Sequence, residues 1–321
     1  MPRLSVVILT LNEAANIHRS LDSLARQDEL DIEVIIVDAA SQDGTPNVVL
    51  RLAETFPAPM RLHLATTQLP IGQARNLGVA MARAPNVAFL SADAEVDPSW
   101  VREALACLEY CDMAFGYQEH RPHRWTMAAA VRSLRYHYPR SAAPDPILFA
   151  SNVAAAYRKQ VLVDHPFDAW ANAAEDLLLA RRAAAAGCTA VYNPRMVVHH
   201  SDVDTVQAET RKNRREGHGW AIYRTELGLQ KAVLAWGAAL LTCVMMIPLF
   251  PLLGTGLLCA TLWLPAVRRA VRRRRAIPFR PLVMGVAASP AFDVTYLVTY
   301  VRGLLSPPAS TRAVPVPKVQ E

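Results

Sequence analysis

Residues 4–38, LSVVILTLNEAANIHRSLDSLARQDELDIEVIIVD, decide the fold of this chain. The two ends of this stretch, 4–10 and 32–38, are short apolar runs rich in β-branched residues, a pattern typical of parallel strands buried on both faces. Between them, apolar residues from Ile17 to Leu24 recur at helical spacing. A strand, a helix and a second strand in this order predict a βαβ unit.

The alternation of strand and helix continues along the chain. A polar turn at 41–45, SQDGT, begins the next helical stretch. Further strands are predicted at 61–66, 86–91, 112–117 and 152–157, and further helices at 72–83 and 175–187. Strands that alternate with helices predict an α/β protein with an open parallel sheet. Residues 118–150, rich in Arg, His and Pro, are expected to form a loop and helix excursion from it.

Composition and charge limit the class of protein. The chain has 321 residues, of which 52% are hydrophobic and 19% charged, and these values exclude a disordered or collagen-like chain. The net charge of +6 favours phosphate groups, nucleic acid or an anionic membrane face as partners. The five cysteines show no metal-binding spacing and fit a reducing compartment. No signal peptide is expected, because Met1 to Arg3 lead straight into a short strand, so the N-terminal part is predicted to fold in the cytoplasm.

Residues 232–267 contain no Asp, Glu, Lys or Arg. One membrane-spanning helix needs about 20 apolar residues, so this stretch is too long for one span and just sufficient for two. Helix-breaking residues lie at its middle, where a hairpin would turn: Pro248, Pro251, Gly254 and Gly256. We therefore predict a transmembrane helical hairpin at 229–267. Helices buried in a soluble protein are the alternative.

A basic run, RRAVRRRR at 268–275, follows the apolar stretch. Positively charged loops stay on the cytoplasmic side, so 268–280 is predicted to be a basic cytoplasmic loop that also binds anionic lipid headgroups. The run abuts the apolar stretch and lacks interleaved aromatic residues, so no nucleic acid partner is expected. Residues 281–305, with Asp293 as the one charge before Arg302, are predicted to form a third membrane-spanning or an interfacial helix. The tail at 306–321 is predicted to be disordered.

Polar residues follow three of the predicted strands, at the edge where open parallel sheets bind ligands. They are Thr10, Asn12 and Glu13 after the first strand, Asp38 after the second, and Ser91, Asp93 and Glu95 after the strand at 86–91. Neither G-x-G-x-x-G nor G-x-x-x-x-G-K-[ST] occurs here, so phosphates would be held by a metal ion or by Arg and Lys. A strand-end carboxylate such as Asp93 suits Mg²⁺ or Mn²⁺, although a role in the turn alone is the alternative.

Six segments in order resemble the family 2 glycosyltransferases, in particular the membrane-associated bacterial type. They are SVVILTLNEAANIHRSLDSL (5–24), EVIIVDAASQDGT (33–45), IGQARNLGVAMA (71–82), FLSADAEVDPSW (89–100), AEDLLLARRAAAAGC (174–188) and YNPRMVVHH (192–200). The resemblance covers about three-fifths of the chain. It implies the Rossmann-like GT-A fold of nucleotide-diphospho-sugar transferases, an open mixed sheet flanked by helices, over 1–228.

The resemblance assigns the nucleotide sugar to several positions. It implies that Thr10, Asn12 and Glu13 contact the base and that Asp38 holds the base or ribose. Three further residues are expected along the nucleotide: Gly72, Arg75 and Asn76. Their alternatives are structural, namely helix entry and a turn for Gly72 and Asn76 and a surface salt bridge for Arg75.

The resemblance also implies a divalent metal, Mn²⁺ or Mg²⁺. The family motif is Asp-x-Asp, and Ser91 replaces its first acid here, which leaves Asp93 as the direct ligand. His199 matches the late histidine that completes the metal shell or contacts the diphosphate, and His200 could exchange roles with it. The basic residues Arg211, Lys212, Arg214 and Arg215 are expected near the diphosphate or the membrane surface, with a solvated charged face as the alternative.

The acidic pair Glu175-Asp176 matches the catalytic motif of the family. We expect Asp176 to take the proton of the acceptor hydroxyl and Glu175 to support it. The alternative is that both acids only charge the first turn of a helix. The implied function is inverting transfer from a UDP-linked sugar to a lipid-linked or membrane-proximal acceptor, for glycolipid or cell-surface polysaccharide synthesis. The catalytic domain would lie on the cytoplasmic side of the bacterial inner membrane.

Two other functions remain open. A membrane-anchored protein that binds nucleotide sugars without turnover is favoured by Ser91 and opposed by Asp93, Asp176 and His199. A nucleotidyltransferase would show a glycine-rich basic loop after the first strand, where this chain has LNEAANIH (11–18). Processive polymerisation is not expected, because few spans are predicted and no Gln-x-x-Arg-Trp motif is found at 207–220.

Overall fold

The computed structural model describes residues 1–65, 68–122, 124–135, 140–141, 145–201, 205–223, 230–248, 251–273, 277 and 279–305. They form two compact units, each described by itself. The sheet unit comprises Met1–Arg121 with Tyr138–Ser201, and the helical unit comprises Pro122–His137 with Asp202–Pro308. This division falls after Ser201, whereas the sequence analysis drew a first domain through 228. The predicted disordered tail at 306–321 lies outside the described residues.

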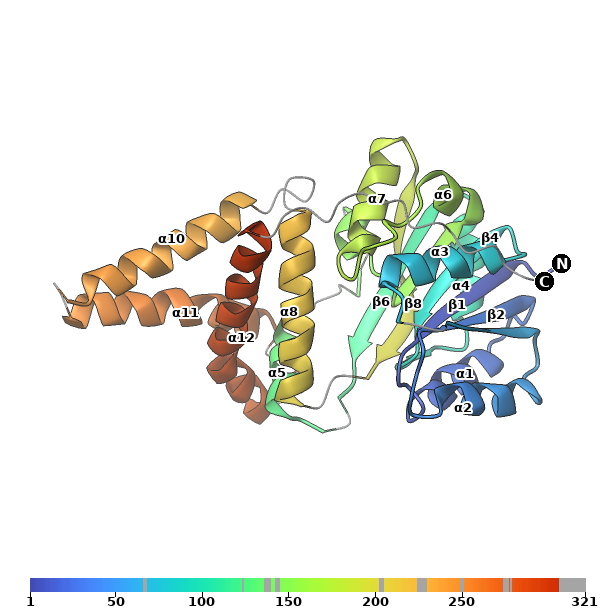
Figure 1. Cartoon of the computed structure of the whole chain (residues 1–321), viewed down its shortest axis with the longest axis horizontal. Helices are drawn as coiled ribbons and strands as arrows, with labels where there is room; N and C mark the ends of the chain where they lie inside the picture. The colour runs from blue at the N-terminus through green and yellow to red at the C-terminus, as the bar shows by residue number, and fades with distance from the viewer. Residues whose placement is uncertain are drawn as a thin grey trace. The chain divides into compact units, whose positions relative to one another are not determined.

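The sheet unit contains an eight-stranded mixed sheet of order β3-β2-β1-β4-β7-β6-β8-β5 (Figure 1). The strands are β1 Leu4–Thr10, β2 Ile32–Asp38, β3 Met60–Leu64, β4 Asn86–Ser91, β5 Ala94–Val96, β6 Met113–His120, β7 Ala154–Arg158 and β8 Ala190–His200. The first four are parallel, as βαβ units require. β7 runs antiparallel to β4 and β6, so the parallel sheet expected from periodicity is correct for one half only.

Helices cover both faces of this sheet. They are α1 Ile17–Ala25, α2 Thr45–Ala53, α3 Ile71–Met81, α4 Trp100–Leu108, α6 Lys159–Asp164 and α7 Glu175–Ala185, with a 3₁₀ helix η1 at Pro146–Phe149. Alternate residues of the central strands enter two separate cores: Ile8 packs in the cluster with Trp100, and Val7 in the cluster with Phe89. Burial on both faces explains why the strands read as continuous apolar runs.

The strand β8 was not among the predicted strands, since Pro194 interrupts its sequence. The register of β8 against β6 shifts between Gly116 and Tyr117, which pair with Asn193 and Val197. Proline is tolerated at such a bulge because no ladder hydrogen bond is lost there. Pairing with β8 also carries β6 through His120, three residues beyond the predicted strand end.

The helical unit contains α5 Met127–Arg135, α8 Val206–Ile222, α10 Gln230–Met246, α11 Pro251–Arg273 and α12 Phe279–Leu305. α10 and α11 form a helical hairpin, in which the indole Nε1 of Trp236 donates to the Thr261 carbonyl at 3.3 Å. α12 packs against α8, α5 and α11. These two helices overlap the hairpin predicted at 229–267, and α11 continues six residues beyond it.

Length and apolar character limit which of these helices could cross a membrane. Within the described residues, one helical segment, Phe279–Tyr300, is long and apolar enough to cross a membrane, and Ala235–Met246 is a shorter apolar segment. The transmembrane assignment of 229–267 thus stays a prediction. Part of the predicted basic loop at 268–280 is helical, since α11 continues through Arg273, in keeping with the good helix propensity of arginine.

Candidate active site

The ends of β1 and β2 are joined by a buried network around Asp38. Thr10 pairs with Asp38 in the parallel register, and its hydroxyl donates to the Asp38 carboxylate at 2.7 Å. Ser41 donates to the same carboxylate from its backbone nitrogen at 2.9 Å and from its hydroxyl at 2.6 Å. Asp38 is only 1% exposed. Its carboxylate therefore fixes the loop that follows β2.

Asn12 connects the loop after β1 to the same turn. Its backbone N–H donates to the Ser41 hydroxyl, and its side-chain oxygen accepts from the Gln42 backbone, both at 2.8 Å. Asn12 has a φ of 60°, in the left-handed region that asparagine enters more easily than most residues. Ala40, with a φ of 64°, lies in this region without that advantage. Such strain is held only where the surrounding structure enforces it, and it clusters at functional sites.

Glu13 turns toward the end of β4. Its backbone N–H donates to the Thr45 hydroxyl at 2.9 Å, and its carboxylate accepts from the Asn16 amide at 2.8 Å. Burial raises the pKa of Glu13, and the charge of Asp93 adds to that rise, whereas His200 opposes it. Glu13, Asp93 and His200 therefore share one electrostatic environment.

The turn that carries Asp93 is held by a buried serine on α1. The Ser20 hydroxyl lies 2.5–3.2 Å from the carbonyl oxygens of Ser91, Ala92 and Ala94. These contacts tie the turn that carries Asp93 to α1. Ser20, which the sequence analysis did not single out, thus shapes the metal-motif turn.

The two neighbouring histidines of β8 contact different partners. The Nε2 of His200 lies 3.3 Å from a carboxylate oxygen of Asp93. The Nε2 of His199 lies 2.7 Å from Asp97, and its Nδ1 lies 3.0 Å from Glu119. Because successive side chains of a strand point to opposite faces, only one of the two can face Asp93. The geometry favours His200, the residue that the sequence analysis named second.

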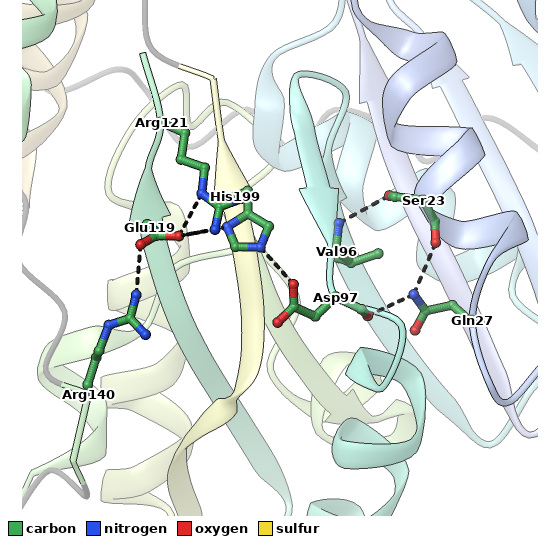
Figure 2. Close-up of polar contacts among 8 residues, drawn as sticks. All are labelled: Ser23, Gln27, Val96, Asp97, Glu119, Arg121, Arg140 and His199. Carbon is green, nitrogen blue, oxygen red and sulfur yellow. Dashed lines mark hydrogen bonds and ion pairs between the residues drawn. The ribbon is translucent and has the colours of Figure 1, made fainter. Parts of the chain in front are cut away.

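Figure 2 shows the surroundings of His199. Glu119 lies beside the His199 ring and also binds Arg121 and Arg140, with 2.6 Å and 2.7 Å between the charged atoms. Asp97, on the other side of the ring, comes from the turn after β5. Burial raises the pKa of Glu119, but the charges of Arg121 and Arg140 bring it below its usual value. His199 therefore belongs to a charged network that ties β6 to β8.

The acidic pair begins α7, and an ion pair fixes its first member. Arg75 donates to the Glu175 carboxylate at 3.1 Å, and Glu175 is buried. The guanidinium also lies 5.0 Å from the ring centroid of Phe89 and 5.7 Å from that of Phe167. Ala174, immediately before the pair, is the third non-glycine residue with positive φ, at 62°. Arg75 thus contacts the acidic pair, in a partly buried ion pair and not the surface salt bridge considered above.

Asp176 is held by backbone donors next to the end of β4. Its carboxylate accepts from the N–H of Asn152 at 3.2 Å and from that of Leu177 at 2.8 Å. Burial, reinforced by the charge of Glu175, raises the pKa of Asp176 to about 6, although Arg75 and both backbone bonds act in the opposite direction. A carboxylate with this pKa is ionised at neutral pH and still basic enough to accept a proton.

Gly72 and Asn76 fix the segment that precedes α7. A Cβ at Gly72 would lie 2.1 Å from the Asp168 carbonyl oxygen, so only glycine fits there. The Asn76 amide donates to the Phe167 carbonyl at 2.7 Å, and its oxygen accepts from the Phe167 N–H at 3.0 Å. The contacts of Gly72 and Asn76 are therefore structural ones, as the alternative given for each of them expected.

The expected site residues gather at one edge of the sheet. Asp38 is the last residue of β2, and Asp93 follows the end of β4. These two strands are parallel and are separated in the sheet by β1. Asp176 binds Asn152, which lies two residues before Ala154, the register partner of Leu90 near the end of β4. Arg211, Lys212, Arg214 and Arg215 lie in α8 of the helical unit.

Three residues near the acidic pair were missed from sequence. Asn152 is buried, and its Nδ2 makes no hydrogen bond within the described residues. Its Oδ1 accepts from the Tyr157 hydroxyl at 2.8 Å, and Tyr157 is fully buried. The third, Phe167, packs against Arg75. No motif or period in the sequence marks these residues, because their roles arise from contacts across the sheet.

Asp93 and His200 fit a divalent cation only in part. Among the described residues, no three His, Cys, Asp or Glu side chains are arranged to hold a metal ion by themselves. One carboxylate and one imidazole are nevertheless suitable donors for Mn²⁺, and ions of this type take further oxygens from substrate phosphates. The arrangement therefore fits an ion that arrives with, and is partly bound by, a diphosphate.

Comparison with known families identifies similar proteins. The model described as "Glycosyl transferase family 2" matches residues 5–165, half of the chain, and that described as "Glycosyl transferase family group 2" matches residues 86–271. Validoxylamine A glucosyltransferase of Streptomyces hygroscopicus subsp. jinggangensis is 35% identical over 141 residues, covering 38% of this chain and 31% of that protein. A PGL/p-HBAD biosynthesis glycosyltransferase of Mycobacterium tuberculosis is 31% identical over 162 residues, covering 49% of this chain and 60% of that protein. The chain thus matches about a third to three-fifths of these relatives.

Solved structures confirm the fold. The mannosyltransferase PcManGT from Pyrobaculum calidifontis, in complex with GDP-Man and Mn²⁺, superposes with a TM-score of 0.57 at 21% identity, over 95% of this chain and 87% of that one. S. aureus TarS in complex with UDP-GlcNAc superposes with a TM-score of 0.54 at 18% identity, over 94% and 91% of the two chains. The open mixed sheet flanked by helices, expected from the resemblance, is therefore confirmed.

Proposed function

The chain belongs to glycosyl transferase family 2, and on that premise we propose that it transfers a sugar from a nucleotide-sugar donor to a hydroxyl acceptor, with inversion at the anomeric carbon. One observation carries this proposal: Asp176, with a pKa raised to about 6, lies at the same sheet edge as the strand-end residues that follow β1, β2 and β4. The structural neighbours named above were solved with GDP-Man or UDP-GlcNAc. A UDP-linked donor is our proposal for this chain.

Asp176 acts as the general base of the reaction. As the acceptor oxygen attacks the anomeric carbon, its proton passes to the Asp176 carboxylate and the nucleoside diphosphate leaves from the opposite side. The pKa near 6 suits this task, since a weaker base would not take the proton and a stronger one would already be protonated. The backbone N–H groups of Asn152 and Leu177 hold the carboxylate in place.

Glu175 and Arg75 position the base. Glu175 is buried and paired with Arg75, so its negative charge raises the proton affinity of the adjacent Asp176. The charge of Arg75 acts in the opposite direction and lowers the pKa of Asp176. Contacts of the Arg75 guanidinium with the rings of Phe89 and Phe167 help to hold it in this position.

The donor is held at the ends of the first strands. We assign the base and ribose to the loops ordered by Thr10, Asn12, Glu13 and Asp38. Asp93 and His200 would hold Mn²⁺ or Mg²⁺, which when bound supplies positive charge to the diphosphate leaving group. Because Ser91 stands where the usual motif has an acid, the ion rests on fewer protein ligands and more on the diphosphate itself.

The acceptor is proposed to be lipid-linked or close to a membrane. The support is the helical unit, with the apolar hairpin of α10 and α11 and the apolar segment Phe279–Tyr300. Such a unit would keep the protein at the cytoplasmic face of a bacterial inner membrane, where glycolipid and cell-surface polysaccharide precursors are built. The sugar acceptor would then be a polyprenyl-linked saccharide or another glycolipid.

A panel of nucleotide sugars, assayed for nucleotide release with and without Mn²⁺ and with a bacterial lipid fraction, tests this function. We expect one donor class to be turned over, release to depend on the lipid fraction, and Asp176→Asn to abolish it. Equal release of nucleotide by the wild type and by Asp176→Asn would show that Asp176 is not the general base. Binding of a donor without any release would support the alternative, a nucleotide-sugar-binding protein, which Ser91 favours.

A further inference from the structure

The hairpin of α10 and α11 presents large apolar side chains outward. Leu252, at the start of α11, is 93% exposed. Further exposed apolar residues on the two helices are Leu241, Val244, Met245, Leu253, Leu257, Leu264 and Val267. Large apolar side chains exposed in this number on two adjacent helices indicate a surface that contacts a protein or a membrane.

The distance from the tip of the hairpin to its two tryptophans matches half of the hydrocarbon core of a bilayer. Trp236 lies ten residues before Met246, the end of α10, and Trp263 lies ten residues after Leu253. At 1.5 Å per residue, ten residues span about 15 Å, which is half of the roughly 30 Å hydrocarbon core. Tryptophan favours the boundary between hydrocarbon and headgroups. Both tryptophans would reach that boundary if the tip of the hairpin stopped at the bilayer centre.

Arginines lie at the depth that this insertion assigns to headgroups. Arg268 is fifteen residues beyond Leu253, about 22 Å along the helix, and half of a bilayer with its headgroup regions is about 20–22 Å. Arg268 and Arg272 on α11 and Arg280 on α12 are all exposed. These positive charges complement anionic phospholipid headgroups. Arg269, between them, is paired with Asp293 of α12 at 2.8 Å.

α12 is apolar enough to span a membrane, but its packing opposes this. It lies alongside α8 (Figure 1), and a Cβ at Gly217 of α8 would lie 2.8 Å from the Tyr296 carbonyl oxygen of α12. α8 carries the exposed residues Arg211, Arg214 and Arg215. A spanning α12 would carry these arginines into hydrocarbon, where charged side chains are strongly disfavoured.

The N-terminal part of α12 lies beside the base of the hairpin, and α12 also carries exposed apolar residues. Its exposed apolar residues include Val283, Met284, Val294 and Val298. An apolar cavity of about 280 Å³ lies in the corner between the two helices, lined by Trp263 and Ala270 of α11 and by Leu282, Val283, Val286 and Ala287 of α12. In Figure 1, the hairpin runs across the direction of α8 and α12. Because α12 runs across the hairpin, a hairpin that stands upright in the bilayer places α12 parallel to the membrane plane.

We propose that the helical unit enters one leaflet of an anionic bilayer through the α10–α11 hairpin, with α12 lying in the plane of the interface and not crossing it. This deepens the proposed function, on whose membrane-proximal acceptor it rests. It replaces the pair of transmembrane spans predicted from sequence with a hairpin that enters and leaves the membrane on the same side. The corner cavity would receive part of a lipid chain.

Vesicle binding by the full chain tests insertion. We expect the wild type to float with vesicles of phosphatidylcholine and phosphatidylglycerol and to bind pure phosphatidylcholine about tenfold more weakly. The double substitution Leu252→Asp and Leu253→Asp should lower binding at least tenfold, because two charges would enter the hydrocarbon. Leu50→Asp, at a similarly exposed leucine of α2, is the matched control and should bind as the wild type does. Equal binding by both variants would overturn the proposal.

Labelling from each side of proteoliposomes tests the topology. In a Cys188→Ser and Cys259→Ser background, a membrane-impermeant maleimide should not reach Leu252→Cys from either side. It should reach Phe279→Cys and Arg302→Cys, near the two ends of α12, from the same side. Labelling of Leu252→Cys from the far side would show that the hairpin spans the bilayer. Labelling of the two α12 sites from opposite sides would show that α12 crosses it, and either result overturns the proposal.

A depth measurement and an activity measurement separate this inference from the proposed function. A bimane on Leu252→Cys should be quenched most by lipids that carry a nitroxide near the end of the acyl chain, and quenching by headgroup nitroxides alone would contradict insertion. Nucleotide release is assayed on the same proteoliposomes. Insertion without release of nucleotide from any donor would support the membrane topology and count against the transferase activity. Release of nucleotide by a protein whose hairpin spans the bilayer would support the transferase activity and overturn the topology.

Discussion

Two aspartates at the same edge of the sheet show how differently one side chain can be used. The carboxylate of Asp38, after β2, accepts three hydrogen bonds from Thr10 and Ser41 and is 1% exposed. That of Asp176, at the start of α7, accepts only two backbone bonds, and its own burial together with the charge of Glu175 raises its pKa to about 6. The difference teaches that position at a strand end does not by itself make a carboxylate reactive. Hydrogen-bond partners and neighbouring charge decide this.

The largest expected effect comes from removing the base. Asp176→Asn keeps the shape of the side chain but cannot accept the acceptor proton, so we expect kcat to fall by about 10²–10⁴-fold with little change in donor binding. Steady-state kinetics and donor titration measure the two quantities. A kcat within threefold of the wild type would remove Asp176 from the mechanism.

Substitution of Asp38, the other aspartate of this comparison, should act mainly on the stability of the folded protein. Asp38→Ala leaves the Thr10 and Ser41 donors without their buried partner, and we expect the free energy of unfolding to fall by about 3 kcal/mol. Denaturant unfolding measures this loss. Asp38→Asn, which retains one acceptor oxygen, serves as the milder control. If Asp38→Ala lost activity but kept full stability, Asp38 would be a direct ligand of the donor instead.

The pH dependence should report Asp176 and not Asp38. The base must be ionised, so kcat should rise with pH through about 6 and, at pH 5, be about tenfold below its plateau. The same raised pKa means that the folded protein binds this proton more tightly than the unfolded chain. The wild type should therefore lose stability relative to Asp176→Asn as pH increases through this range. A pH–rate profile without an acid limb near 6, or the opposite stability trend, contradicts the assignment.

The two histidines of β8 offer a second pair to compare. His200→Ala removes the imidazole beside Asp93, so we expect the Mn²⁺ concentration for half-maximal activity to rise about tenfold. His199→Ala removes a contact to Asp97 and Glu119 and should alter this concentration little. Metal titrations of both variants provide the measurement. The reverse order of effects would restore the original assignment of the metal to His199.

The smallest expected effect concerns backbone strain before the acidic pair. Ala174 has a φ of 62°, which glycine adopts without a Cβ penalty. Ala174→Gly should therefore raise the free energy of unfolding by up to about 1 kcal/mol. Thermal unfolding tests this, with Ala173→Gly, at a neighbouring residue outside the positive-φ region, as the control expected to lower stability.

Much of the fold could be predicted from local pattern. The strands β1, β2 and β4 read as apolar runs because both faces of the sheet are covered, and the helix α7 shows its end at Gly187. β8 could not be predicted, since Pro194 is tolerated only at a bulge that β6 creates. The helical continuation of α11 through Arg268–Arg273 was likewise read as a loop, because charge was taken as the end of the apolar segment.

The residues of the candidate site likewise include some that could be predicted from the sequence and some that could not. Thr10, Asp38, Asp93 and Asp176 stand out because polar residues at strand and helix ends are visible in any single sequence. Ser20, Asn152 and Tyr157 do not, since each acts through a partner more than four residues away or on another element. His199 and His200 are adjacent in the chain, and no local pattern shows which of them faces Asp93.

The sequence by itself determined the class of fold, the family and the set of residues able to carry the chemistry, because hydrophobic period and short motifs are properties of neighbours along the chain. Only the tertiary structure decided which of those residues work together. It raised the pKa of Asp176 through the burial of that side chain and the charge of Glu175, and it joined His200 to Asp93. It also laid α12 alongside the charged helix α8. These outcomes depend on burial and on distances between remote segments, which the order of residues does not express locally.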